Sequence, residues 1–237
     1  MRYDLYCKNE NYNTCLCKNK CSMYRTDSCN ENCATFVQTD YMFQLSGLPH
    51  CWWRNIEFDF DSVNSNHFST LEKICNNVEL FVRNGFNLFL WGETGVGKTS
   101  LAIKLMLNYF IAIADRTDYI TRGLFINVPS FLRDYRLNMT NQTSNWRELL
   151  ESIKTCDIVI FDDLFQTVET KFESQIVYSY INDRIFADKS CIFTSNLDPE
   201  RIESIDERLY SRICEGSDCV NISGSDARRT RKFSDFM

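Results

Sequence analysis

The sequence predicts an α/β fold, in which helices flank a parallel sheet, preceded by a small cysteine-rich N-terminal domain. From residue 86 onward, apolar runs of strand length alternate with helix-like segments, and a glycine-rich loop joins the first run to the first helix. In addition, six of the twelve cysteines fall within the first 33 residues. We therefore expect a cysteine-rich zinc-binding domain over residues 1–45, a linker over 46–68 and the α/β domain over 69–237.

Composition limits the class of protein. The chain has 237 residues, 44% of them hydrophobic, so it can bury a sizeable core. Its net charge of −6 argues against a general nucleic-acid coat protein, although a local basic groove near Arg133 and Arg136 remains possible. The N-terminal residues lack the apolar centre of a secretion signal, and no run approaches the ~18 apolar residues of a membrane span. We expect a cytoplasmic protein without a membrane partner.

The N-terminal cysteines indicate a metal site. Two similar pairs, Cys17 with Cys21 and Cys29 with Cys33, would bring four thiolates around one tetrahedral Zn²⁺. A segment this short and polar buries too little surface to fold alone, so a metal would supply the missing stability. Disulfides and unmetallated thiols are the alternatives, and Cys7 or Cys15 could replace one of the four ligands.

Helical patterns begin after a turn and an extended segment. Residues 46–49 form a turn-like break, and residues 52–61 alternate apolar and charged side chains like an extended segment. Ser69 with Glu72 then predicts a capping box for a helix that ends at Asn84 and Gly85.

The α/β domain follows in chain order. The predicted strands are residues 86–91, 123–128, 157–161, 191–195 and 219–222. The predicted helices begin at Lys98, at Pro129 or Ser130, and at a cap formed by Asn145 and Glu148, and a long one spans about residues 169–187.

The first strand-to-helix loop carries a phosphate-binding pattern, G-x-x-x-x-G-K-[ST]. Its residues are Gly92, Glu93, Thr94, Gly95, Val96, Gly97, Lys98 and Thr99, with Ser100 following in the helix. Glycines let successive N–H groups point at a phosphate, and the helix N-terminus adds positive potential. Lys98 would reach the β- and γ-phosphates, and the Thr99 hydroxyl would bind Mg²⁺. The sequence therefore predicts a site for ATP.

Polar residues follow two later strands. Asp162 and Asp163 end the third strand, where Asp162 would hold Mg²⁺ with Thr99 and Asp163 would orient the attacking water. Asn196 follows the fourth strand and would contact the γ-phosphate and that water.

Three arginines complete the candidate set. Arg208 and Arg212 lie four residues apart on a predicted helix face, and a guanidinium suits the charge that develops on a transferring phosphoryl group. Arg228 after the last strand is either a nucleotide-sensing arginine or part of a basic tail.

Together, these motifs resemble the AAA+ ATPases, and more narrowly the DnaC/DnaI-type replicative helicase loaders of Gram-positive bacteria and their phages. The resemblance covers residues 69–237 and assigns Asp162 and Asp163 to Walker B, Asn196 to sensor 1, Arg228 to sensor 2, and Arg212, or failing that Arg208, to an arginine finger. It implies a slow ATPase that assembles as a homo-oligomer and delivers a DnaB-type helicase onto single-stranded DNA, with the zinc domain docking on the helicase.

Two other classes remain open. An IstB-like transposition ATPase or a DnaA-like initiator shares the AAA+ core, but an initiator is expected to carry a C-terminal duplex-reading domain, for which the sequence after the core leaves little room. A P-loop small-molecule kinase is expected to work as a monomer and would have no use for Asn196 and Arg212.

Overall fold

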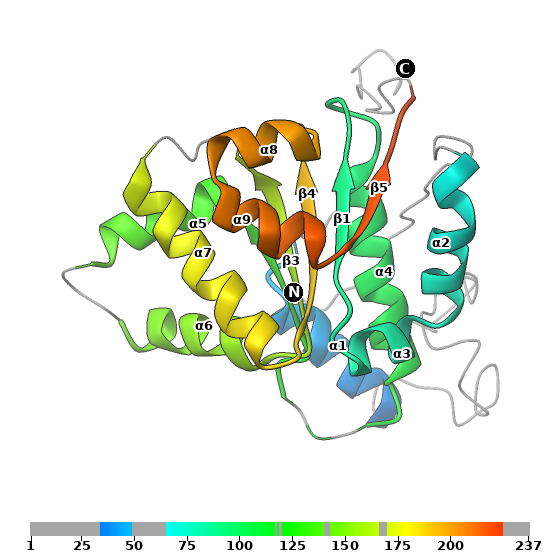
Figure 1. Ribbon diagram of the computed structural model, residues 1–237. Coiled ribbons are helices and arrows are strands. Elements are labelled where there is room, and N and C mark those ends of the chain that lie inside the picture. Colours follow the sequence, from blue (N-terminus) through cyan, green and yellow to red (C-terminus); the bar gives the residue numbers. More distant parts are fainter. Residues whose placement is uncertain are drawn as a thin grey trace, which may run out of the picture.

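Five parallel strands form the sheet of this protein (Figure 1). The computed structural model describes residues 34–48, 65–116, 118, 120–139, 143–165 and 170–224. In sheet order the strands are β2 (Gly123–Asn127), β3 (Ile158–Leu164), β4 (Ser190–Ser195), β1 (Leu88–Trp91) and β5 (Asp218–Asn221). All four strand pairs are parallel, which confirms the predicted α/β class. Every strand therefore ends at the same edge of the sheet, here called the carboxyl edge.

Strand register aligns the polar residues that follow the strands. Trp91, the last residue before the glycine-rich loop, lies opposite Ser195, and Asn127 lies opposite Asp162. Between β3 and β4 the register shifts from Phe161 to Leu164. This irregularity falls at the two aspartates, so the backbone there departs from a regular ladder.

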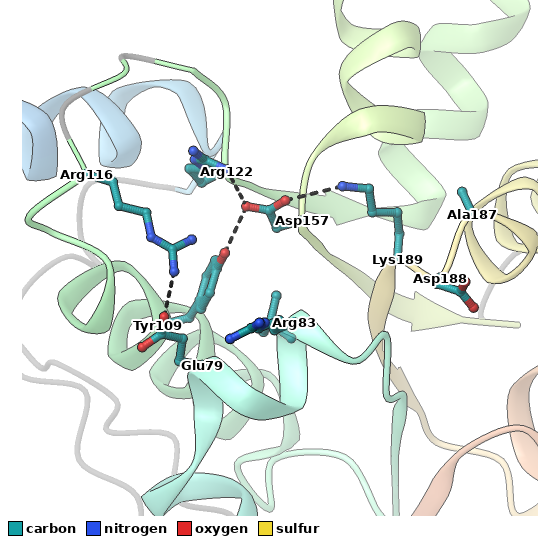
Figure 2. Close-up of a pocket in the computed structure, with 10 residues that line it drawn as sticks. Glu79, Arg83, Tyr109, Arg116, Arg122, Asp157, Ala187, Asp188 and Lys189 are labelled. Carbon is teal, nitrogen blue, oxygen red and sulfur yellow. Dashed lines mark hydrogen bonds and ion pairs between the residues drawn. The ribbon is translucent and has the colours of Figure 1, made fainter.

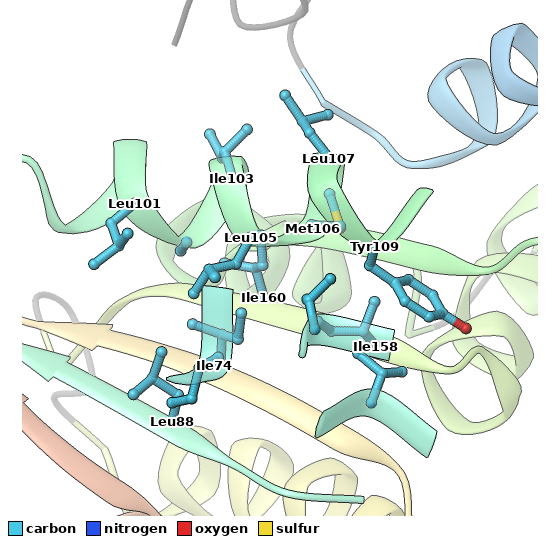
Figure 3. Close-up of a cluster of buried hydrophobic side chains, with 14 of the residues drawn as sticks. Ile74, Leu88, Leu101, Ile103, Leu105, Met106, Leu107, Tyr109, Ile158 and Ile160 are labelled. Carbon is cyan, nitrogen blue, oxygen red and sulfur yellow. The ribbon is translucent and has the colours of Figure 1, made fainter. Parts of the chain in front are cut away.

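Helices cover both faces, and alternate residues of each strand enter separate cores. One core packs beneath α4 (Lys98–Ala112), joined by α1 (Ala34–Leu45), α2 (Ser65–Asn76) and α3 (Val78–Arg83), and includes Leu88, Ile158 and Ile160 (Figure 3). The opposite core lies beneath α5 (Val128–Leu137), α6 (Ser144–Thr155), α7 (Lys171–Phe186), α8 (Pro199–Ile205) and α9 (Glu207–Tyr210). Burial of each large apolar side chain contributes about 1.5–3 kcal/mol.

Helix ends show where the sequence pattern misled. α2 begins at Ser65, so Ser69 and Glu72 lie inside it, and the predicted capping box is wrong. The cap of α6 is Thr143, whose side chain accepts the Trp146 N–H, and not the predicted Asn145 and Glu148. α3 ends before Asn84, as predicted. α7 has a full capping box of Thr170 and Glu173, close to its predicted start.

α1 packs on the α/β domain. The Phe43 ring meets Phe110 of α4 edge to face, with centroids 5.7 Å apart, and the Ser46 carbonyl accepts the Phe125 N–H at 2.7 Å. The segment at residues 52–61 and the four predicted zinc ligands lie outside the described residues. No described helix is long and apolar enough to cross a membrane.

A fully buried arginine ties together the amino ends of β3 and β4. Arg184 of α7 has no exposed surface, and its guanidinium donates to backbone carbonyls from α6 to the start of β4. Those acceptors are the carbonyls of Ile153, Cys156, Asp157 and Ser190. Backbone oxygens and two thiols, rather than a carboxylate, therefore solvate this charge.

Candidate nucleotide site at the carboxyl edge of the sheet

The loop between β1 and α4 has the backbone of an anion cradle. Gly95 and Gly97 have φ values of 88° and 95°, a region that costs other residues energy. A Cβ on Gly92 would lie 2.0 Å from the Ile222 carbonyl oxygen, so only glycine fits where β5 passes the loop. Gly97 caps α4 without a side-chain hydrogen bond. Gly97 thus supplies no side-chain cap to the first turn of α4, the position at which a helix N-terminus can bind a phosphate.

Lys98 joins the loop to the tip of β4. Its side chain is 5% exposed, and Nζ donates to the carbonyl oxygens of Gly92 and Glu93 at 2.9 and 2.7 Å. Nζ also donates to Asn196 Oδ1 at 2.9 Å. The ammonium is therefore surrounded by oxygen atoms at the point where phosphate oxygens would arrive.

Asp162 lies beside Thr99, which fits a magnesium site. Its Oδ1 accepts hydrogen bonds from Thr99 Oγ1 at 2.7 Å and from Thr194 Oγ1 at 2.8 Å. Burial raises the pKa of Asp162 above its usual value, and the neighbouring Asp163 adds to this. Together they outweigh the hydrogen bonds from Thr99, Thr194 and Asn127, which lower the pKa. No salt bridge reaches this carboxylate in the described part of the chain. A buried carboxylate beside a hydroxyl offers the oxygen ligands that Mg²⁺ prefers.

Asp163 is held in an unusual backbone conformation. Its φ of 58° is in the left-handed region, and its N–H donates to Thr194 Oγ1 at 3.0 Å. Asn127, at the tip of β2, approaches Asp163 Oδ2 with its amide nitrogen at 3.5 Å. Strained residues at a strand tip are typical of functional sites. The Asp163 carboxylate thus lies within reach of the tip of β2.

Two members of this site were missed from the sequence. Asn127 received no role, although it lies near the end of a predicted strand, and that position was the available signal. Thr194 lies in the predicted fourth strand, two residues before Asn196, and its hydroxyl contacts both Asp162 and the Asp163 backbone.

The predicted finger arginines lie elsewhere. Arg208 belongs to α9, and Arg212 to the π-helical turn Ser211–Glu215 that follows it, so they do not share one regular α-helix. Both pack against α7, and neither has a hydrogen bond to the glycine-rich loop. Arg228 lies outside the described residues.

The proposed basic groove is paired with acids. Arg133 is close to Asp134, and Arg136 forms an ion pair with Glu173 of α7. Both arginines are exposed on α5. The structure therefore leaves the nucleic-acid groove as a prediction.

A second pocket, of about 330 Å³, lies at the opposite edge of the sheet (Figure 2). Its central Asp157 accepts from the Tyr109 hydroxyl at 2.8 Å and pairs with Arg122 and Lys189 at 2.9 and 3.3 Å. Burial pushes the pKa of Asp157 upward, but these hydrogen bonds and charges outweigh it and hold the pKa below its usual value. The charges pair with one another, so this pocket is a structural ion network.

Comparisons place these features among known proteins. A sequence profile of the bacterial DnaA ATPase domain matches residues 57–219. The chromosomal replication initiator protein DnaA of Wolinella succinogenes is 29% identical over 164 residues, which is 67% of this chain and 35% of that protein. DnaA of Buchnera aphidicola subsp. Baizongia pistaciae is 26% identical over 179 residues, 75% and 34% of the two chains. The chain thus spans about a third of the length of these relatives.

Solved structures share the fold. The DnaC helicase loader superposes with a TM-score of 0.59 at 19% identity, covering 74% of this chain and 100% of that one. DnaI gives 0.55 at 22% identity, covering 76% and 94%. The replication initiator DnaA bound to AMPPCP and single-stranded DNA gives 0.54 at 18% identity, covering 69% and 47%. At these identities the likeness concerns the fold alone.

Proposed function

The chain belongs to the family of the bacterial DnaA ATPase domain, and we propose that it is an ATP-driven helicase loader that acts in replication initiation. In this proposal it delivers a ring-shaped DnaB-type helicase onto single-stranded DNA. The observation that carries the ATPase function is the meeting of Lys98, Thr99, Asp162 and Asn196, from separate segments, through direct hydrogen bonds at one edge.

Phosphate binding begins with the loop amides. The triphosphate would lie against the backbone of residues 93–99 and the uncapped start of α4. Lys98 already presents its ammonium there, so its carbonyl contacts would be exchanged for phosphate oxygens. This exchange requires only a side-chain movement.

Thr99 and Asp162 are the residues that would hold Mg²⁺. When bound, the ion would neutralise charge on the β- and γ-phosphates. Thr194 orients the Asp162 carboxylate and, by accepting the Asp163 N–H, fixes the spacing of the two acids.

Hydrolysis would use Asp163 and Asn196. Asp163 would accept the proton of the attacking water, and the Asn196 amide would orient that water and the γ-phosphate. Arg212 would come from a neighbouring copy, because its own position is away from the loop of its chain.

The helicase-loading part of the proposal rests on the motif resemblance. In that arrangement the N-terminal cysteines, Cys17, Cys21, Cys29 and Cys33, hold Zn²⁺ and residues 1–45 dock on the helicase. A DnaA-like initiator is the second candidate, and the family match over residues 57–219 specifically favours it.

Hydrolysis of ATP by purified protein tests the site. Lys98→Ala should lower turnover by at least about a hundredfold, the scale of losing a preorganised cation. Lys73→Ala, an exposed lysine on α2, is the matched control and should hydrolyse ATP like the wild type. Equal turnover of all three proteins would contradict the proposed site.

Capture of partners separates loader from initiator. A loader should retain replicative helicase in a pull-down and lose it when residues 1–33, which precede the packed helix α1, are removed, whereas an initiator should retain origin duplex DNA instead. A metal assay on the same preparation tests the zinc domain, and less than about half an equivalent would defeat the four-thiolate site.

A further inference from the structure

Three side chains of α7 form a platform for the two arginines. Tyr178, Asn182 and Phe186 are four residues apart, so they share one face of the helix. The Arg208 guanidinium lies 5.3 Å from the centre of the Tyr178 ring, and that of Arg212 lies 5.4 Å from the Phe186 ring. Arg212 Nε also donates to Asn182 Oδ1 at 3.1 Å.

The two arginines differ in how their charge is balanced. Arg208 pairs with Asp206, with its nitrogens 3.2 and 3.3 Å from the carboxylate. Arg212 forms no salt bridge with any acid in the described ranges, and only its Nε is engaged. Its two Nη atoms, the fork that binds phosphate bidentately, are left for another partner.

The exposed position of Phe186 is not explained by packing in a described hydrophobic core. At 74% exposure it is the most exposed large apolar side chain among those described. The Arg212 guanidinium is the cation stacked on its ring. An aromatic kept at the surface under one cation suggests that the ring serves that cation.

The turn that carries Arg212 lies far from the glycine-rich loop of its own chain. It leads to Gly216, whose carbonyl accepts the amide of Asn87, just before β1 begins. The glycine-rich loop follows the other end of β1. The contacts of Arg212 are with α7 and not with that loop.

We propose that Phe186 and Asn182 are positioning residues that hold Arg212 for the nucleotide of a neighbouring copy, whereas Arg208 is fixed within its own chain by Asp206. This inference rests on the proposed ATPase function with a finger supplied in trans. Phe186 would fix the plane of the Arg212 guanidinium, and Asn182 would fix its Nε. Both Nη atoms would then be preorganised to bind the γ-phosphate, with less side-chain entropy lost on binding.

Mixing of two inactive variants isolates the donating subunit. Lys98→Ala removes nucleotide binding but leaves Arg212, and Arg212→Ala removes the finger but leaves nucleotide binding. A mixture of the two should recover ATP hydrolysis that neither has alone, with a rate that depends on protein concentration.

The platform is then tested by adding a second substitution either to the Lys98→Ala protein, which donates Arg212, or to the Arg212→Ala protein, which accepts it. Phe186→Ala or Asn182→Ala added to the Lys98→Ala donor should lower the recovered kcat about fivefold with KM unchanged, and Phe186→Trp should restore it. Phe186→Ala added to the Arg212→Ala acceptor should change nothing. Phe172→Ala, an exposed phenylalanine about 21 Å along the same helix, is the matched control in the donor.

Failure of the platform and failure of the proposed function give different results. If Arg212→Ala hydrolyses ATP like the wild type, the finger in trans is wrong. If the simple mixture recovers activity but the Phe186→Ala and Asn182→Ala donors match the Lys98→Ala donor, the platform is refuted. Equal loss from donor and acceptor would also refute it, because it would mean a general contact between copies. Since Phe186 is exposed, its variants should melt within about 2 °C of their parents.

Discussion

Replacement of Asp162 by asparagine is expected to stabilise the nucleotide-free protein while removing its response to Mg²⁺ and nucleotide. The carboxylate is 4% exposed, and its side-chain donors, the hydroxyls of Thr99 and Thr194 and the amide of Asn127, are all uncharged. Its burial costs several kcal/mol, and each hydroxyl bond to a charge returns about 1.5–3 kcal/mol. The raised pKa of Asp162 fixes the sign, because the charged form is the disfavoured one.

The expected gain is about 1 kcal/mol, which is about 2–4 °C in Tm for a protein of this size. The gain depends on pH. A raised folded pKa means that Asp162 destabilises the folded state above that pKa, and that this cost disappears below the unfolded value of about 3.9. The Tm difference between Asp162→Asn and the wild type should therefore shrink as pH falls from 7 toward 4.

Thermal melts with and without Mg²⁺ and a non-hydrolysable ATP analogue supply the measurement. At a hundred times Kd, binding should stabilise the wild type by about 2.7 kcal/mol, and addition of Mg²⁺ should not raise the Tm of the variant further. Glu72→Gln, an exposed acid on α2, is the control and should behave as wild type. An Asp162→Asn protein that melts below the wild type without ligand, or that keeps its response to Mg²⁺, would refute the reasoning.

Three further predictions concern other groups. Arg184→Met should lower the unfolding free energy measured in urea by about 3–5 kcal/mol, because it removes a donor from four backbone carbonyls, of which the Asp157 carbonyl keeps the Ser190 N–H. A loss below about 1 kcal/mol would contradict this role. The lowered pKa of Asp157 stabilises the folded state above the unfolded pKa, and this stability is lost as pH falls through the folded pKa. Asp157→Asn should therefore be less stable than the wild type at pH 7, and its unfolding free energy should fall less between pH 5 and 3. A hydrogen bond from the Cys214 thiol lowers the pKa of Cys219, whereas burial raises the pKa of Cys75. Peptide mapping after brief alkylation at pH 7 should therefore find Cys219 modified before Cys75. The reverse order would be evidence against the hydrogen bond between Cys214 and Cys219.

The sheet was predicted well because its central strands are buried on both faces. Ile158 to Phe161 is a continuous apolar run, and a parallel central strand needs nothing else. The helix starts were less predictable. Ser69 with Glu72 matches a capping box, but Leu71 lies in the core and the chain continues as helix back to Ser65, so tertiary packing overrides the local signal.

The residues of the candidate site could be predicted where they lie at the end of a strand that the sequence reveals. The likeness of Asp162 and Asn196 to known motifs places both at the carboxyl edge, and the parallel topology then brings them to Lys98. The position of Asn127 near a strand end was visible in the sequence, but its contact with Asp163 was not, because that contact involves an aspartate with a left-handed backbone. Nor does spacing reveal that Arg212 rests on Phe186, since the two come from separate elements.

Three features of the candidate nucleotide site leave the nucleotide-free chain less stable than it could be. Asp162 keeps a buried charge without a cation, Asp163 holds a left-handed backbone, and α4 begins without a side-chain cap. A bound magnesium nucleotide would neutralise the charge of Asp162 and occupy the start of α4, so its binding would stabilise the folded state at the carboxyl edge. Arg212 lies on an element that packs on α7, and α7 follows Asp162 and Asp163 in the chain. The two aspartates are therefore linked to Arg212 through α7. A change in the order of the aspartates could alter the position of Arg212 by this route, as an assembly controlled by ATP requires.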